Sequence, residues 1–124
     1  MKGQEIRVLM VEPNEHPKEF LLKNTLPAMQ EAVGGLIDIV DLNDDACILL
    51  NDEGKLTGLE GNRRIGNDVI VGNFYICGYT DGGELASLSD EALEKYMELF
   101  WEPEEITLEE IEATCRVEFY PLDF

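Results

Sequence analysis

Apolar residues along the chain fall into short runs separated by Gly, Pro, Asn and Asp, which is the pattern of strands joined by turns. Residues 5–12 are almost continuously apolar and end at Pro13, so they predict a central strand covered on both faces. Gly72 lies inside another apolar run and indicates a bulge or a close approach of backbone there. Residues 18–23 carry no period that assigns them to a helix or a strand. Further strands are predicted at residues 36–42, 46–50, 69–78 and 114–120, and the first two of these are expected to pair antiparallel.

Two helices are predicted from apolar positions three and four residues apart and from the residues that flank them. The first extends for about two turns from Leu26, with Asn24 or Thr25 as its cap, and ends at Gly34. Residues 107–110 match a capping box and predict one further helical turn. The second helix begins after the cap residue Ser89 and is expected to bury Leu93, Tyr96, Met97 and Phe100.

The centre of the chain, between the strands at 46–50 and 69–78, is polar and rich in glycine. Residues 51–54 have the pattern of a type I turn in which Gly54 takes a positive φ. Residues 55–59 can then return along the preceding strand, and residues 60–68 are expected to form a loop.

The order of these elements predicts a single α+β domain over residues 1–124. We expect a largely antiparallel mixed sheet of about five or six strands, with two or three helices packed on one face. Residues 1–100 are the expected core, and residues 101–124 are an acidic C-terminal extension with a short helix and a closing strand.

The formal net charge of −18 excludes several partners. So negative a protein repels the phosphates of nucleic acids and anionic lipids, whereas the charge is compatible with a basic partner, with a cation, or with solubility alone. No apolar stretch is long enough to cross a membrane, and no N-terminal cleavage pattern is present. Cys47, Cys77 and Cys115 are an odd number without CxxC spacing and are expected to be buried free thiols, which indicates the cytoplasm.

The sequence contains no catalytic motif and no metal-ligand spacing, so we expect neither an enzyme nor a cofactor. His16 is the one histidine, whereas a zinc site needs four ligands. A nucleophilic pair of Cys77 with His16 would require a tertiary contact, and Cys77 is better explained as part of the core. Adjacent carboxylates arise by chance among 27 acidic residues.

The glycine-rich loop at residues 58–66 contains Arg63 and Arg64, the one adjacent pair of basic residues in the chain. Two guanidinium groups beside glycines can hold a carboxylate or a phosphate. The candidate anion-binding residues are therefore Asn62, Arg63, Arg64 and Lys55. Alternatively, one arginine ties the loop to neighbouring carboxylates and the other is solvated.

Acidic residues are concentrated in residues 84–124, which hold 13 of the 27 acidic residues and two of the nine basic ones. Like charges four residues apart destabilise a helix, so something outside the helix is expected to favour them. Their spacing of about 6 Å along the axis resembles a row of phosphates, which suggests a mimic of DNA. A solvated helix face is the alternative. The candidate partner-binding residues are Glu91, Glu94, Glu98 and Glu102.

Two segments, EIRVLMVEPNEHP and VGGLIDIVDLNDDACILLNDEGKLTGLEGNRRIGNDVIVGNFYICG, resemble an uncharacterised bacterial and phage family, the domain of unknown function 3846. The family pattern is IRVLxVEPxxxP, then VGGxIE, then NxEGKxxxLxxNR followed by DxIVGxF, and it extends to about residue 100. This chain departs at Asp38, where the family more often has Glu. Matching residues in the central motif are Asn51, Glu53, Gly54, Lys55, Leu59, Asn62, Arg63, Asp68, Ile70, Val71, Gly72 and Phe74.

The resemblance implies a setting but no chemistry. Proteins of this kind are encoded on phages and on integrative or conjugative elements, and no catalytic residue carries over from them. The leading hypothesis is therefore a small cytoplasmic accessory protein of such an element, acting through protein contacts, with interference with host defence by DNA mimicry as one form. The alternative is a domain that binds a small anion at the glycine and arginine loop.

Overall fold

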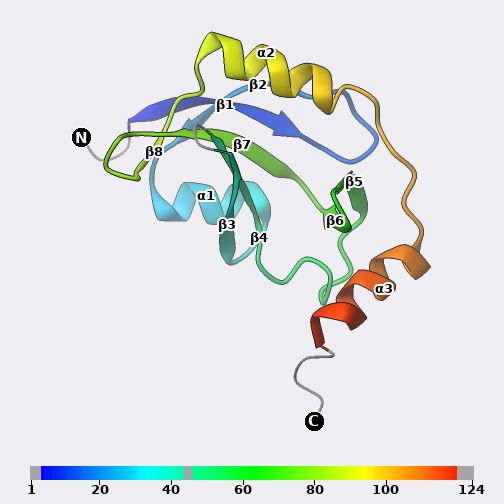
Figure 1. Ribbon diagram of the computed structural model, residues 1–124. Helices are drawn as coiled ribbons and strands as arrows, with labels where there is room; N and C mark the ends of the chain where they lie inside the picture. Colours follow the sequence, from blue (N-terminus) through cyan, green and yellow to red (C-terminus); the bar gives the residue numbers. More distant parts are fainter. Residues whose placement is uncertain (1–3, 44–45, 120–124) are drawn as a thin grey trace.

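The computed structural model describes residues 4–43 and 46–119, and it has a central antiparallel sheet with helices around it (Figure 1). The strands are β1 (Glu5–Val11), β2 (Lys18–Lys23), β3 (Ile37–Asn43), β4 (Ala46–Asn51), β5 (Gly61–Ile65), β6 (Asp68–Val71), β7 (Phe74–Tyr79) and β8 (Leu85–Ala86), and the helices are α1 (Leu26–Val33), α2 (Asp90–Leu99) and α3 (Leu108–Phe119). The order across the central sheet is β2-β1-β7-β4-β3, and the short strand β8 also pairs with β7. A separate two-stranded sheet consists of β5 and β6. The α+β class is confirmed.

The helices cover both faces of the central sheet, which corrects the prediction that they share one face. The physical reason is that β1, β4 and β7 are apolar at both odd and even positions, so each face must be shielded from water. On the α1 side lie Ile6, Val8, Leu22, Met29, Val33, Cys47, Leu49, Tyr75 and Cys77. On the α2 side lie Leu9, Val11, Ala46, Ile48, Ile70, Phe74, Ile76, Leu88, Ala92, Leu93, Tyr96 and Phe100.

The two predicted helices form where their capping residues placed them. Thr25 caps α1, because its side chain accepts a hydrogen bond from the backbone N–H of Ala28, and Gly34 ends the helix in the left-handed conformation. Ser89 caps α2 in the same way through the N–H of Ala92. Residues 18–23, which the sequence left unassigned, form β2 and pair antiparallel with β1.

The run at residues 69–78 is two strands of different sheets rather than one strand. Gly72 separates β6 from β7 with a φ of +72°, and a Cβ at this position would lie 2.7 Å from the Cδ1 atom of Leu59. A residue with a side chain would therefore be strained there both by the positive φ and by the contact with Leu59. Because the backbone turns at Gly72, β6 pairs with β5 and β7 enters the central sheet.

The central polar segment differs from the prediction in three respects. Residues 61–65, expected to be loop, form strand β5. Residues 55–59 do not return along β4 but form a helical turn, in which the N–H of Leu59 bonds to the carbonyl of Gly54 at 3.0 Å. Gly58 closes that turn at a φ of +81°, so the positive φ predicted for Gly54 occurs four residues later.

The predicted closing strand at residues 114–120 is also wrong, because α3 continues through Phe119; Tyr120 lies outside the described residues. The Thr107 side chain accepts a hydrogen bond from the N–H of Glu110 and starts the helix. No proline or glycine follows before Pro121, so the helix has no reason to end after one turn. Ile111 packs against Val69 and Val71 of β6.

Candidate functional site

The adjacent residues Asn62, Arg63 and Arg64 lie in β5, at a bulge in its pairing with β6. The register shifts between Gly61 and Arg63, and such a bulge allows two successive side chains to be directed to the same side. Asn62 and Arg63 are both completely buried, whereas Arg64 is exposed. Asn62 and Arg63 therefore belong to the interior of the protein, whereas Arg64 belongs to its surface.

The Asn62 side chain joins β5 to two other segments. Its amide nitrogen donates to the carbonyl of Val11, at the end of β1, at 3.0 Å and to the carbonyl of Gly72 at 2.7 Å. Its amide oxygen accepts a hydrogen bond of 2.8 Å from Nη1 of Arg63. Asn62 thus fixes the hairpin to the central sheet and orients Arg63.

The Arg63 side chain uses all five of its N–H groups on neighbouring oxygen atoms. Nε and Nη2 donate to the carbonyl of Phe100 at 3.1 and 2.9 Å. The second N–H of Nη2 donates to the carbonyl of Glu15 at 2.7 Å. Nη1 donates to the backbone and side-chain oxygens of Asn62 at 3.3 and 2.8 Å. We call these groups, the Asn62 and Arg63 side chains with the carbonyls of Glu15 and Phe100, the Arg63 cluster.

The Arg63 cluster ends helix α2. Phe100 is the C-cap residue, and a carbonyl at this position has no donor within its own helix. The Arg63 guanidinium supplies that donor and also places a positive charge at the negative end of the helix dipole. Burial lowers the pKa of Arg63, and the charge of Glu104 opposes this shift. An arginine nevertheless stays protonated, so the cluster holds a buried cation on carbonyl oxygens.

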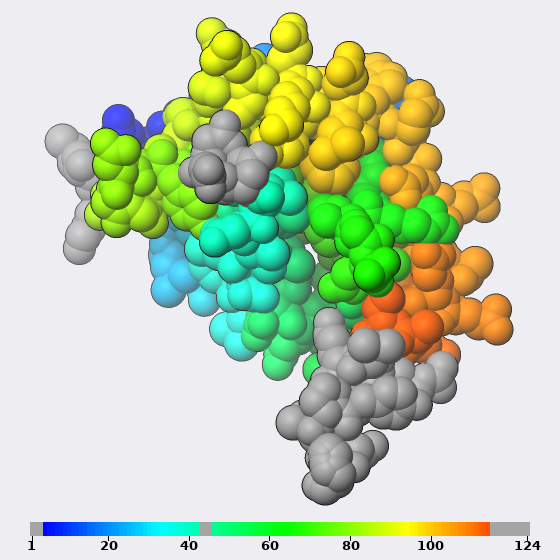
Figure 2. Space-filling view, viewed as in Figure 1, coloured from blue at the N-terminus to red at the C-terminus, as the bar shows by residue number. Residues whose placement is uncertain are grey.

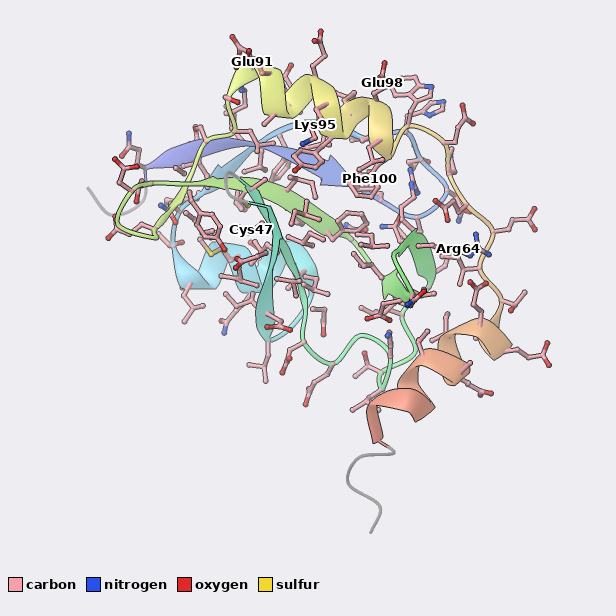
Figure 3. All side chains as sticks on the ribbon, viewed as in Figure 1. Cys47, Arg64, Glu91, Lys95, Glu98 and Phe100 are labelled. Carbon is pink, nitrogen blue, oxygen red and sulfur yellow. The ribbon has the colours of Figure 1, made fainter. Side chains whose placement is uncertain are left out.

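Arg64, labelled in Figure 3, is paired with Glu110 in the first turn of α3 and with Glu104 in the segment before that helix. Its Nε and Nη2 donate to the two carboxylate oxygens of Glu110 at 2.5 and 2.8 Å, and Nη1 donates to Glu104 at 3.0 Å. The hydrogen bonds that Arg64 donates to Glu110 raise the pKa of Arg64, and reciprocally they lower the pKa of Glu110. This arginine ties the hairpin to α3 and the segment before it.

The two arginines have different kinds of partner, as one of the two alternatives predicted only in part. One arginine does tie the segment to neighbouring carboxylates, but the other is buried on carbonyls rather than solvated. Because all five N–H groups of Arg63 are in use, an anion could bind Arg63 only if its guanidinium exchanged a protein oxygen for the ligand. Lys55, the fourth candidate, pairs with Asp68 at 2.5 Å and lines a separate cleft that includes none of Asn62, Arg63 and Arg64.

The four candidate glutamates, Glu91, Glu94, Glu98 and Glu102, are all exposed. Helix α2 lies across the outer side of the sheet, and the labelled side chains of Glu91 and Glu98 point away from it (Figure 3). Lys95 lies over the ring of Tyr96, with its Nζ atom 5.0 Å from the ring centre. Because the helix is capped at both ends and buries its opposite stripe, the carboxylates project from a fixed element.

His16 and the cysteines are in structural positions. The His16 ring stacks on Trp101 with 4.0 Å between ring centres, and its Nδ1–H donates to the Trp101 carbonyl at 2.6 Å. Cys47 and Cys77 are opposite one another on β4 and β7 and completely buried, which confirms the core interpretation. Their mutual hydrogen bond and burial raise the pKa of Cys77 well above the usual thiol range. The Cys115 side chain lies outside the described residues.

Among residues 4–43 and 46–119, no group of three or more His, Cys, Asp or Glu side chains is arranged to hold a metal ion. No described helix is both long and apolar enough to cross a membrane. The members of the Arg63 cluster that the sequence did not reveal are Glu15 and Phe100, which take part through backbone carbonyls and so have no signature in residue type.

A protein-family model with the description Domain of unknown function (DUF3846) matches residues 6–101. The matched range contains every residue of the Arg63 cluster, whereas Glu104 and Glu110, the partners of Arg64, lie beyond it. No solved structure matches the chain.

Proposed function

Since the chain belongs to the family described as Domain of unknown function (DUF3846), which carries no activity to transfer, we propose that it is a small non-enzymatic accessory protein that acts through protein contacts. The contact surface, which we call the acidic face, is made up of Glu91, Glu94 and Glu98 on α2 together with Glu102 just beyond the end of the helix. The partner is a basic protein, and a DNA-binding protein fits this chemistry best.

The observation that carries the proposal is the outward row of carboxylates on a helix that is fixed at both ends. Glu91 and Glu98 are seven residues apart, which is about 10 Å along a helix axis. A row of negative charges can replace the phosphates of a DNA strand in a basic groove. Because the helix is already ordered before binding, its backbone loses little conformational entropy when the complex forms.

The cellular setting is part of the same proposal. We place the protein in the cytoplasm, encoded on a phage or on a conjugative or integrative element, because the sequence resembles proteins from such elements. A protein that occupies the DNA groove of a host defence enzyme would benefit such an element. The net charge of −18 supports the proposal further, because it favours fast association with basic proteins and opposes direct binding to nucleic acid.

Neutralising the acidic face is expected to abolish capture of DNA-binding proteins. The test variant carries E91Q, E94Q, E98Q and E102Q. The control variant carries E31Q, D81N, E84Q and E112Q, at four exposed carboxylates outside α2, so both variants have the same net charge. Each protein is immobilised and exposed to a bacterial lysate at low salt, where electrostatic attraction is strongest.

Wild type and the control variant should retain DNA-binding proteins that added duplex DNA releases, whereas the test variant should not. Recovery of no DNA-binding protein by the wild type would contradict mimicry. Equal recovery of DNA-binding proteins by both variants would show that the net charge of the protein, and not the acidic face, determines the binding.

A further inference from the structure

A cleft of about 390 Å³ separates the β3–β4 pair of the central sheet from the β5–β6 hairpin. Figure 2 shows it as a hollow between the cyan to teal surface of β3 and β4 and the green surface of the hairpin. Its volume is in the range of cavities that hold small organic molecules. The cleft lies apart from the Arg63 cluster and does not include the acidic residues of α2.

The walls of the cleft are apolar and come from two different sheets. On the central sheet, Val40 is the cross-strand partner of Ile48, and Leu50 lies beside them. The hairpin contributes Ile65 and Ile70 from the opposite side. The Val40 side chain is 46% exposed, and Leu56, which also lines the cleft, is 64% exposed. These side chains leave apolar surface in contact with water that a ligand could cover.

The polar residues that line the cleft are mainly acidic. They include four carboxylates, from Asp38, Asp52, Glu53 and Asp68, against the single ammonium group of Lys55. Asp68 is already engaged with Lys55 at 2.5 Å. The carboxylates of Asp38, Asp52 and Glu53 belong to exposed residues at the rim, so the field at the mouth of the cleft is negative.

We infer that this cleft binds a small organic cation, with an apolar body between β3–β4 and the β5–β6 hairpin and a primary ammonium group at the acidic rim. The apolar walls supply the affinity through burial of the ligand body. The carboxylates select the charge, because a ligand carboxylate at the same rim would meet like charges. The site is independent of the proposed protein contact on α2.

Phenethylamine, 2-phenylethanol and 3-phenylpropionate are suitable probes, because they share an aromatic body and differ in the charge of the end group. We expect saturable binding of the amine, measured by shifts of backbone amide signals in residues 38–40, 48–53 and 65–71. Affinity for the amine should exceed that for the acid by about tenfold or more. Added salt should weaken amine binding and leave the alcohol nearly unchanged.

Two variants localise the site. V40R places a cation at the mouth of the cleft and should reduce amine affinity by about tenfold or more. The matched control is L21R, at a leucine that is 60% exposed on β2, the opposite edge of the sheet, and it should bind like the wild type. The inference is overturned if the amine does not saturate, if the acid binds as well as the amine, or if V40R binds as well as L21R.

Discussion

Replacing Arg63 by alanine is expected to lower the free energy of unfolding by about 3–5 kcal/mol. The substitution removes five hydrogen bonds and leaves the buried carbonyl of Phe100 and the partly buried carbonyl of Glu15 without these donors. It also opens a cavity at a side chain with no exposed surface. The loss should appear in urea unfolding as a lower midpoint with an unchanged slope.

The adjacent arginine provides the matched control for this prediction. Arg64 carries the same charge on the same strand, but its pairs with Glu104 and Glu110 are exposed to solvent. R64Q should therefore cost much less than R63A, because exposed ion pairs contribute little. R63K should also be destabilising, since an ammonium group has three donors and cannot reach both carbonyls in the planar fork of a guanidinium. Equal and small losses in R63A and R64Q would contradict the structural role of Arg63.

Replacing Gly78 by alanine is expected to cost about 2–3 kcal/mol. A Cβ at this position would lie 2.5 Å from the carbonyl oxygen of Ser87 and 3.3 Å from that of Ala86. These are backbone atoms, so β8 would have to move away from β7. That movement would also strain the contacts of the next residues with Arg7, whose backbone N–H bonds to the Ser87 hydroxyl at 2.8 Å and whose carbonyl accepts from Leu88 at 2.9 Å.

Gly82 is the matched control for Gly78. It lies in the turn between β7 and β8, its φ is not positive, and the nearest atom to an added Cβ would be the Thr80 hydroxyl at 3.8 Å. G82A should leave stability unchanged or raise it slightly, because alanine has fewer unfolded conformations than glycine. A G78A protein as stable as G82A in urea unfolding would show that β8 does not pack against Gly78 as described.

The parts of the fold that depend on residues close together in the sequence could be predicted. Thr25 and Ser89 identified the beginnings of α1 and α2, because a cap acts on residues two or three positions away. The helical period likewise placed Glu91, Glu94 and Glu98 on the exposed side of α2. Helix α3 began at its predicted cap, but its length depends on contacts with β6, which local pattern does not specify.

The role of Arg63 could not be predicted, because its partners are backbone carbonyls 37 and 48 residues away in the chain. A charged residue among glycines suggests a solvent-exposed loop, and only the assembled fold shows that β5 passes between the β1–β2 turn and the end of α2. Gly72 gave the one relevant local signal, and its positive φ divides the apolar run into two strands.

Arg63 is part of the fold, and we propose that recognition takes place elsewhere, on the outer surface. The most direct test is to follow the Arg63 Nε–H signal by nuclear magnetic resonance during a titration with inorganic phosphate. We expect a signal that exchanges slowly with water and does not shift as phosphate is added, since its acceptor is the Phe100 carbonyl. Rapid exchange together with a saturable shift on phosphate would instead identify Arg63 as an anion-binding residue.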